Sequence, residues 1–427
     1  MNETTPSDPS RREFLRTTTQ AAALGAVGLS GSAWTAADAS APPADLPREL
    51  NPTSANLGTL FPDVRRLAEK NEYAYSFLGD RFRDLDTFKA EARAKVLELL
   101  LYRPEKVDPQ PQVLDRSDQG EYIREKMVFS TSPLFRVPAY VLIPKNLKKP
   151  APAIVDLHSH GGMFLFGKEK VIDLGRNHPA MTAYHQRNYD GRPTATALVR
   201  RGFVVISIDA FMFGERRVLM DADVKYGYDR SRYTLEMVQQ LNQVCRAKEA
   251  TLVKSLIFAG LTWPGIVFWD DLRTVDYLLT RPEVDPRRIG CVGISMGGYR
   301  ALYLAGLDER IAAACVVGFM SSVRPMIQAH IDTHSWVHFL PTIHRYLDLP
   351  DVVSMMAPKP LLVQQCSRDG LFPLAGMKES VAKIAAVYEK AGVKDRFAGR
   401  FHDQPHIFSR DMQDEAFAWF EERLQAK

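Results

Sequence analysis

A single serine constrains the fold of this chain more than any other residue. Residues 293–297 read Gly-Ile-Ser-Met-Gly, after an apolar run that begins at Ile289 and before a stretch compatible with a helix. In a sharp strand-to-helix turn the serine backbone is strained, and a side chain two positions before or after it would clash with the neighbouring strand and helix. The pattern predicts that Ser295 stands at the top of a sheet, at a helix N-terminus, where its hydroxyl can act as a nucleophile. The motif alone is a weak signal, since a Gly-rich turn with an idle serine has the same sequence.

The residues that would activate this serine come later in the chain. A nucleophilic serine needs a histidine as general base and a carboxylate that orients the histidine. Asp369 lies in the turn after one apolar segment, and His406 lies in the loop after the last one. Serine, then acid, then histidine is the order in which a strand-turn-helix motif of this kind carries a triad. His402 and Asp403 are the second choices for base and acid.

A Gly-rich turn follows another apolar segment, upstream of the serine. Residues 158–162 read His-Ser-His-Gly-Gly. A backbone N–H of His160 or of Gly161 can stabilise a developing oxyanion together with the N–H of Met296. The sequence does not decide between His160 and Gly161. The alternative is a tight turn in which the glycines only supply positive φ angles.

With these residues the chain resembles the α/β-hydrolase superfamily, and within it the branch of dienelactone hydrolase-like and acetyl xylan esterase-like proteins. The resemblance implies a mostly parallel, eight-stranded, doubly wound sheet with helices on both faces. It also implies that Ser295 is the nucleophile, His406 the base and Asp369 the residue that orients the base. One departure is Ser159, where many members have glycine. The motifs that carry the resemblance are residues 157–162, 209–216, 293–298, 369–373 and 405–406.

The N-terminus resembles an export signal. Residues 10–16 read Ser-Arg-Arg-Glu-Phe-Leu-Arg, and a weakly apolar, Ala/Gly-rich run follows from Ala21 to Ala33. Adjacent arginines, Phe-Leu and a short apolar run indicate a twin-arginine signal peptide over residues 1–41. The apolar run is too short and too Gly-rich to span a membrane as a stable helix, so we expect no stable membrane anchor. We expect the twin-arginine export machinery to be a partner and the mature protein to be periplasmic or secreted.

The composition is that of an ordinary globular protein. Of 427 residues, 45% are hydrophobic and 25% are charged, and the net charge is only +4. No Lys/Arg cluster indicates a nucleic-acid partner, and no second apolar run indicates a membrane anchor. The four cysteines are expected to be small core residues rather than a disulfide framework. They are Cys245, Cys291, Cys315 and Cys366.

The periodicity of apolar residues divides the remaining chain into two parts. Residues 42–118 are predicted to be an N-terminal extension, largely helical, with helices over 60–72 and 85–102. Residues 119–427 are predicted to be the catalytic domain, an α/β-hydrolase fold that ends in a helix over 410–424. An antiparallel hairpin is expected first, and six parallel strands separated by helices after it. The eight expected strands are Tyr122–Phe129, Phe135–Ile143, Ile154–Leu157, Val204–Asp209, Ile289–Ile294, Ala312–Phe319, Leu361–Gln365 and Phe397–Phe401.

Two connections, at about residues 210–265 and 320–350, are too long for simple crossovers. Long ordered loops at the ends of such strands are usually functional, so both are predicted to be lids over Ser295. The second contains His330, His334 and His338, whose spacing would place three imidazoles on one helix face. Such a face can bind a metal, but no His-Glu-x-x-His pattern is present and a serine triad needs no metal or cofactor. A partly buried polar face that lines the pocket is the simpler expectation.

Several residues near the expected pocket are candidates for substrate contacts. They are His158, Glu215, Arg216, Trp336 and His338. Glu215 and Arg216 follow a strand and can bind a sugar hydroxyl, but they can equally pair with charged neighbours and hold the loop. Asp270 and Asp271 are expected to cap a helix start, where the helix dipole favours carboxylates.

These expectations describe an exported serine carboxylic ester hydrolase that acts through an acyl-enzyme. The resemblance implies short-chain acyl esters, in particular acetyl esters of carbohydrates, or related small esters. Two alternatives stay open. One is a serine peptidase of the prolyl oligopeptidase type, although this chain shows no long β-rich propeller region before the catalytic domain. The other is a noncatalytic binding protein on a hydrolase scaffold. Aromatic and polar lid residues suit a sugar ring better than a long alkyl chain. These are Tyr226, Tyr228, Tyr233, Trp263, Trp336 and His338.

Overall fold

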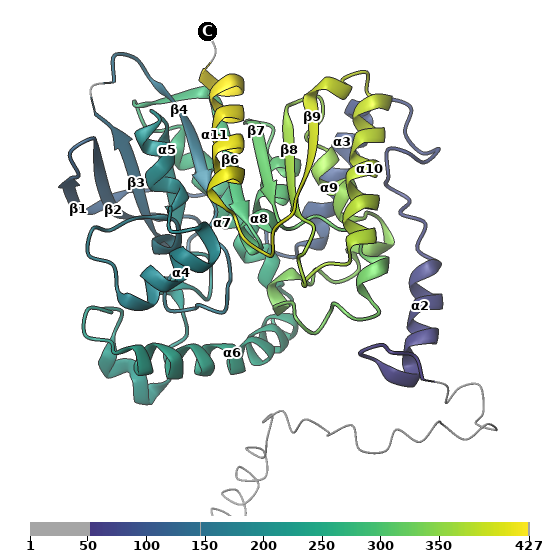
Figure 1. The fold of residues 1–427 in the computed structure, drawn as a ribbon, viewed down its shortest axis with the longest axis horizontal. Helices are drawn as coiled ribbons and strands as arrows, with labels where there is room; N and C mark the ends of the chain where they lie inside the picture. Colours follow the sequence, from purple (N-terminus) through teal and green to yellow (C-terminus); the bar gives the residue numbers. More distant parts are fainter. Residues whose placement is uncertain (1–51, 146, 426–427) are drawn as a thin grey trace, which may run out of the picture. The chain divides into compact units, whose positions relative to one another are not determined.

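A nine-stranded sheet forms the centre of the part of the chain that the computed structural model describes, residues 52–145 and 147–425 (Figure 1). The predicted signal peptide lies outside these residues. The strands follow the order β1-β2-β3-β5-β4-β6-β7-β8-β9. The first three pair antiparallel at one side of the sheet, and the other six are parallel. The strands are β1 (Gln112–Asp118), β2 (Tyr122–Ser130), β3 (Arg136–Pro144), β4 (Ala151–Asp156), β5 (Val204–Ile208), β6 (Val284–Ile294), β7 (Ile311–Val317), β8 (Leu361–Cys366) and β9 (Phe397–His402).

The order of the parallel strands creates one crevice at the carboxyl ends of the sheet. After β4 the chain first adds β5 on one side and then returns to add β6 on the other side of β4. The strand order reverses at β4, and the connections that follow β4 and β5 run in opposite directions. This leaves a gap at the carboxyl ends of the strands, which is where open α/β sheets bind their ligands. The ends of β4 and β6 carry residues 158–162 and Ser295, so the topology brings these two motifs together.

Helices pack on the sheet and on one another around an apolar core. In Figure 1, α11 crosses in front of the strands while α7 and α8 lie behind them, and α6 runs along the lower end of the sheet. The helices are α2 (Phe61–Glu69), α3 (Leu85–Leu99), α4 (Pro179–Tyr189), α5 (Thr194–Arg200), α6 (Leu235–Phe258), α7 (Trp263–Leu278), α8 (Met296–Leu307), α9 (Leu349–Ser354), α10 (Leu374–Lys390) and α11 (Arg410–Phe420). Among the described residues no single helix is both long and apolar enough to span a membrane; only α6 and α7 together pass that test, as a pair bent by 85°.

The sheet has one strand more than the sequence predicts. The additional strand is β1, which pairs with β2 and lies inside the segment that was expected to be a largely helical extension. Six of its seven residues are exposed, so its sequence shows no alternation of apolar and polar residues. β1 lies on the rim of the sheet, where pairing of its backbone with β2 needs no apolar side chains and leaves no periodic signal in the sequence.

The segment 320–350 is also built differently from expectation. It contains single turns of 3-10 helix, at Arg324–Met326, Trp336–His338 and Ile343–Arg345, and α9 begins only at Leu349. The three histidines therefore do not lie on one helix face. Side-chain hydroxyl groups form hydrogen bonds here with backbone groups that a continuous helix would pair with one another. Thr333 Oγ1 donates to the His330 carbonyl, and Ser335 Oγ accepts from the Val337 N–H.

The four cysteines are all buried and unpaired, which confirms that they are core residues. The core they belong to is continuous across both faces of the sheet, and the parallel strands β4, β5 and β8 are buried along their whole length. Such strands are expected where helices cover both faces of a parallel sheet.

Candidate active site

Ser295 occupies a strained turn between β6 and α8. Its backbone has φ 61° and ψ −126°, a conformation that L-residues rarely adopt. A Cβ on Gly293 would lie 2.5 Å from the Gly297 carbonyl carbon, and a Cβ on Gly297 would lie 1.9 Å from the Leu157 oxygen. Both contacts are with backbone atoms that cannot move aside cheaply. The two glycines are therefore required because the turn packs directly against the end of β4.

His406 and Asp369 meet at the ends of two neighbouring parallel strands, β9 and β8. His406 Nδ1 lies 2.5 Å from Asp369 Oδ2, and the other carboxylate oxygen accepts the Leu371 N–H at 2.9 Å. The Asp369 side chain is fully buried. His406 Nε2 has no hydrogen-bond partner among the described residues. The carboxylate thus holds the ring so that Nδ1 carries the proton and Nε2 is free to accept one.

The second choices for acid and base lie elsewhere. His402 ends β9 with Nε2 3.1 Å from Glu415 of α11, and Asp403 is exposed and pairs with Arg368 at 2.8 Å. Neither residue lines the cavity that contains Ser295. His402 is the last residue of the strand, whereas His406 lies in the loop that turns back over the sheet edge.

The loop 158–162 is fixed by contacts on several sides. Ser159 Oγ lies 2.6 Å from Tyr184 Oη and 3.1 Å from Tyr189 Oη, contacts that a glycine at this position could not make. The Gly162 N–H donates to His160 Nδ1. Within the described part of the chain, the N–H groups of His160, Gly161 and Met296 donate to no other protein group. These three donors are therefore available to a ligand at Ser295.

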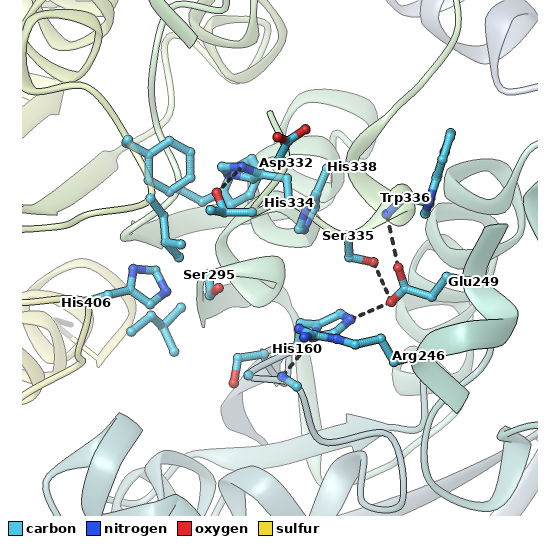
Figure 2. Close-up of a pocket in the computed structure, with 18 of the residues that line it drawn as sticks. His160, Arg246, Glu249, Ser295, Asp332, His334, Ser335, Trp336, His338 and His406 are labelled. Atoms are coloured by element: carbon cyan, nitrogen blue, oxygen red, sulfur yellow. Dashed lines mark hydrogen bonds and ion pairs between the residues drawn. The ribbon is translucent and has the colours of Figure 1, made fainter. Parts of the chain in front are cut away.

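A cavity of about 590 Å³ opens at these residues (Figure 2). Ser295, His406, His160, Gly161, Trp336 and His338 line it, as the sequence predicts for a pocket at the elbow. Met296 is fully buried beneath it. The lining also contains polar residues that no motif marks, because they come from α4, from α6 and from the irregular segment after β7. These are Asn188, Arg246, Glu249, Asp332, Thr333, His334 and Ser335.

Glu249 of α6 joins three parts of the cavity wall (Figure 2). Its Oε1 lies 2.9 Å from His160 Nε2 and accepts the Ser335 hydroxyl at 3.0 Å, and its Oε2 accepts the Trp336 N–H at 3.4 Å. Burial lowers the pKa of His160 although Glu249 acts in the opposite direction. A glutamate within a helical stretch gives no sequence signal for such a role, because most helical glutamates face solvent.

Residues 62–411 match the sequence profile of the Abhydrolase family. The chain belongs to this family. This chain is 26% identical over 308 residues to YtaP of Bacillus subtilis strain 168, which is provisionally named a hydrolase. The match covers 72% of this chain and 90% of YtaP.

Two solved structures resemble the Abhydrolase chain over most of its length. A protein from Bacteroides fragilis NCTC 9343, provisionally named an acetyl xylan esterase, has a TM-score of 0.59 at 20% identity, over 80% of this chain and 81% of its own. A glucuronoyl esterase from Solibacter usitatus has a TM-score of 0.54 at 15% identity, over 80% of this chain and 94% of its own. At these identities the likeness shows the fold. The α/β-hydrolase fold predicted from the sequence is thereby confirmed.

Three residues of this Abhydrolase chain that were candidates for substrate contacts do not line the cavity. His158 is fully buried; its Nε2 accepts the Ala210 N–H and its Nδ1 donates to the Ser159 carbonyl. Glu215 pairs with Lys168 at 2.9 Å and with Lys126 at 3.0 Å. His158 and Glu215 therefore contact groups of the protein itself instead of the cavity.

Arg216, the third of these candidates, pairs with a carboxylate inside α7. Its Nη1 lies 2.6 Å from Asp270, while the neighbouring Asp271 accepts two hydrogen bonds from Arg300. The expectation that Asp270 and Asp271 cap a helix start is wrong. The helix begins earlier, at Trp263, and Thr262 is its N-cap. Both aspartates are buried and hold arginines instead.

His334 and His338 form an aromatic wall of the cavity, with ring centroids 5.6 Å apart. Burial lowers the pKa of both rings, so both are neutral at pH 7. Over residues 52–145 and 147–425, no group of three or more His, Cys, Asp or Glu side chains is arranged to hold a metal ion.

Proposed function

We propose that this Abhydrolase protein is a serine carboxylic ester hydrolase that acts through an acyl-enzyme. One observation carries the proposal: His406 is held by Asp369 through Nδ1, while its Nε2, which has no partner in the described part of the chain, shares a cavity with Ser295. A base held in one tautomer beside a serine at a strained elbow is the arrangement that activates a hydroxyl. Backbone N–H groups without a partner among the described residues lie at the same place.

The reaction follows from the roles of these groups. Ser295 Oγ forms a bond to the ester carbonyl carbon as its proton moves to His406 Nε2, and the carbonyl π electrons move onto the oxygen. The N–H of Met296 and that of His160 or Gly161 stabilise this oxyanion, each such donor contributing about 3 kcal/mol. The C–O bond to the alcohol then breaks, and His406 returns the proton to the leaving alcohol. Water attacks the acyl-enzyme by the same steps and releases the acid.

We propose short-chain acyl esters of carbohydrates, acetyl esters in particular, as the substrates. The names of the two structural neighbours support a carbohydrate ester, and the polar lining of the cavity suits hydroxyl groups. The aromatic residues give less support than the sequence suggested. Of the six lid residues considered, only Trp336 and His338 line the cavity, and Tyr233 and Trp263 are buried in the body.

Three measurements on the purified protein test the proposal. A fluorophosphonate probe should label Ser295 in the wild type and leave Ser295→Ala unlabelled. Rates on p-nitrophenyl acetate, butyrate and octanoate should fall with chain length, and acetylated xylan should release acetate. A preference for octanoate with no acetate released from any acetylated sugar would reject the carbohydrate ester. Failure of the probe and of all three aryl esters would reject the hydrolase itself.

We further propose that residues 1–41 direct export by the twin-arginine route, and that the mature protein is periplasmic or secreted. The support is the Arg11-Arg12 pair followed by Phe-Leu and a short apolar run. Replacing both arginines with lysine should leave the precursor in the cytoplasm, with the activity of the mature protein unchanged. Fractionation followed by immunoblotting measures this, and normal export of the double variant would contradict it.

A further inference from the structure

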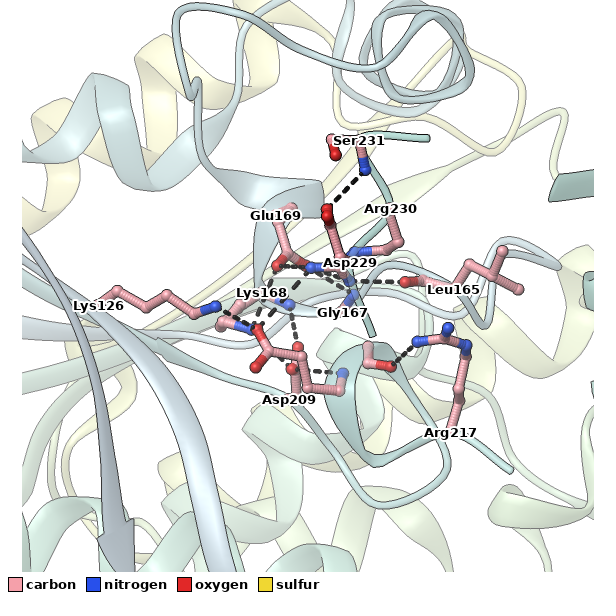
Figure 3. A network of polar contacts seen from close by, with 12 residues as sticks. Lys126, Leu165, Gly167, Lys168, Glu169, Asp209, Arg217, Asp229, Arg230 and Ser231 are labelled. Atoms are coloured by element: carbon pink, nitrogen blue, oxygen red, sulfur yellow. Dashed lines mark hydrogen bonds and ion pairs between the residues drawn. The ribbon is translucent and has the colours of Figure 1, made fainter. Parts of the chain in front are cut away.

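Two lysines of one 3-10 turn, Lys168 and Lys170, are fully buried, and their surroundings differ. Lys168 forms ion pairs with Asp209 at 2.7 Å and Glu169 at 3.2 Å, in addition to the pair with Glu215 (Figure 3). Lys170 forms no ion pair with any of the described residues. A buried lysine without a carboxylate carries the full cost of desolvation, so its contacts require an explanation.

The contacts of Lys170 converge on the loop 158–162. Its Nζ donates to the Ser159 carbonyl at 2.7 Å and to the His160 carbonyl at 3.1 Å. It also lies 4.6 Å from the centroid of the Phe213 ring. The Ser159 carbonyl accepts a second hydrogen bond, from His158 Nδ1 at 3.0 Å. Burial holds the pKa of Lys170 well below its ordinary value, and either the ammonium or the neutral amine has enough N–H groups for both bonds.

These two carbonyls belong to two peptide groups whose N–H donors bond to no group within residues 52–145 and 147–425. The Ser159 carbonyl shares a peptide plane with the His160 N–H, and the His160 carbonyl shares one with the Gly161 N–H. In a planar trans peptide the C=O and the N–H point in opposite directions. Drawing both carbonyls toward Lys170 therefore turns both N–H groups away from the buried side of the loop. Ser159, His160 and Gly161 line the cavity with Ser295, whereas Lys170 does not.

We propose that Lys170 is a positioning residue for the oxyanion hole, which holds the Ser159–His160 and His160–Gly161 peptides with their N–H groups toward Ser295. The proposal rests on the function proposed above. Lys170 does not touch the substrate; it acts through the two peptides, orienting them and adding to their polarity. Because the donors matter most when the carbonyl oxygen becomes an anion, loss of Lys170 should weaken the transition state more than the bound ester.

The test is Lys170→Met, which keeps the length of the side chain and removes the donors. On p-nitrophenyl acetate, kcat should fall by about 10- to 100-fold, less than the ~100- to 1000-fold that loss of an oxyanion donor causes, with KM within about threefold of the wild type. Inhibition by trifluoroacetophenone, whose adduct with the serine places an oxyanion in the hole, should weaken by the same factor as kcat/KM. If Lys170 had only a structural role, the variant would have a lower melting temperature, but inhibition and kcat/KM would not weaken by the same factor.

Two further variants keep the test decisive. Lys383 of α10 lies remote from the loop and donates to the buried Asp351 of α9 at 2.6 Å. Lys383→Met should therefore lower stability while kcat stays unchanged. Lys170→Gln retains an N–H donor and should recover part of the lost kcat; it also replaces Lys170→Met if that variant does not fold. A folded Lys170 variant with wild-type kcat, or one that changes KM alone, would overturn the proposal. An inactive wild type that the fluorophosphonate probe does not label would instead overturn the proposed function.

Discussion

The cavity at Ser295 has two walls that are built in different ways. The sheet wall consists of Ser295, His406 and residues 159–162, each of which follows the carboxyl end of a parallel strand within a few residues. The lid wall consists of residues from α6 and from the segment after β7, including Arg246, Glu249, Asp332 and Trp336. Glu249 accepts the Ser335 hydroxyl and the Trp336 N–H within this wall and contacts His160 of the sheet wall, and Trp336 is 46% exposed.

We assign the reaction to the sheet wall and the selection of the substrate to the lid wall. Backbone pairing in the sheet fixes the strand ends to within fractions of an ångström, which a nucleophile and its base require. The lid wall depends on a few polar contacts and can change without disturbing the sheet. We therefore expect substitutions in the sheet wall to abolish turnover, and substitutions in the lid wall to change mainly the affinity for substrate.

Replacement of Ser295 with alanine should have the largest effect. Loss of the nucleophile leaves only binding and oxyanion contacts, so kcat on p-nitrophenyl acetate should fall by about 10⁴-fold or more. The circular dichroism spectrum should be that of the wild type. A residual rate above a few per cent would remove Ser295 from the proposed mechanism.

The two histidines near the end of β9 provide a matched comparison. His406→Ala should approach the defect of Ser295→Ala, and Asp369→Asn should lower kcat by about 10⁴-fold because the wrong tautomer of His406 would be held. His402→Ala removes only the contact with Glu415 and should leave kcat within a few-fold of the wild type. If the two histidine variants exchanged these kcat values, His402 would be the base.

The elbow itself can be tested by adding one methyl group. Gly297→Ala places a Cβ 1.9 Å from the Leu157 oxygen, so the end of β4 and the elbow must separate. We expect a loss of at least about 1–3 kcal/mol in the free energy of unfolding, together with a large loss of kcat. Gly79→Ala is the control, because its Cβ would make only an ordinary 3.5 Å contact. Urea unfolding measures both, and equal stability of the two variants would contradict the strained elbow.

A change in the lid wall should be milder. Glu249→Gln weakens the bonds to His160 and Ser335 by removing the charge, a loss of about 1–2 kcal/mol for charge-assisted hydrogen bonds. We expect KM for an acetylated sugar to rise by up to about tenfold, with kcat changed less. Steady-state kinetics measures the split. A loss of kcat as large as that of His406→Ala would show that the two walls are not independent.

The last prediction concerns the stability of the sheet below the active site, where no loss of turnover is expected. Burial raises the pKa of Asp156, at the end of β4, to about 7, and its carboxyl accepts the Thr194 hydroxyl at 2.6 Å. The raised pKa means that the neutral carboxyl stabilises the fold at low pH, and that this contribution is lost as pH rises from about 4 to about 7. Asp156→Asn keeps an acceptor without the charge. Its stability relative to the wild type should rise over that window by at most about 1.4 kcal/mol per pH unit, measured by urea unfolding. A constant difference would contradict the pKa shift.

The sequence by itself determined the elements that carry a local pattern. The hairpin, the six parallel strands and the elbow all follow from apolar runs and glycines that neighbour one another in the chain. Such patterns report the burial of each segment, which is why the fold class was predictable. They also located Ser295, Asp369 and His406, because each follows a strand end.

Only the tertiary structure decided the features that depend on contacts between distant segments. β1 is a strand because β2 offers backbone partners, and Glu249 belongs to the cavity because α6 crosses the sheet end near His160. Glu215 and Arg216 are turned inward by Lys168 and Asp270, which lie 47 and 54 positions away in the chain. The same holds for Lys170, whose position under the loop has no local signature. Hydrogen bonds and ion pairs act over a few ångströms in space, whereas a sequence pattern records only proximity along the chain.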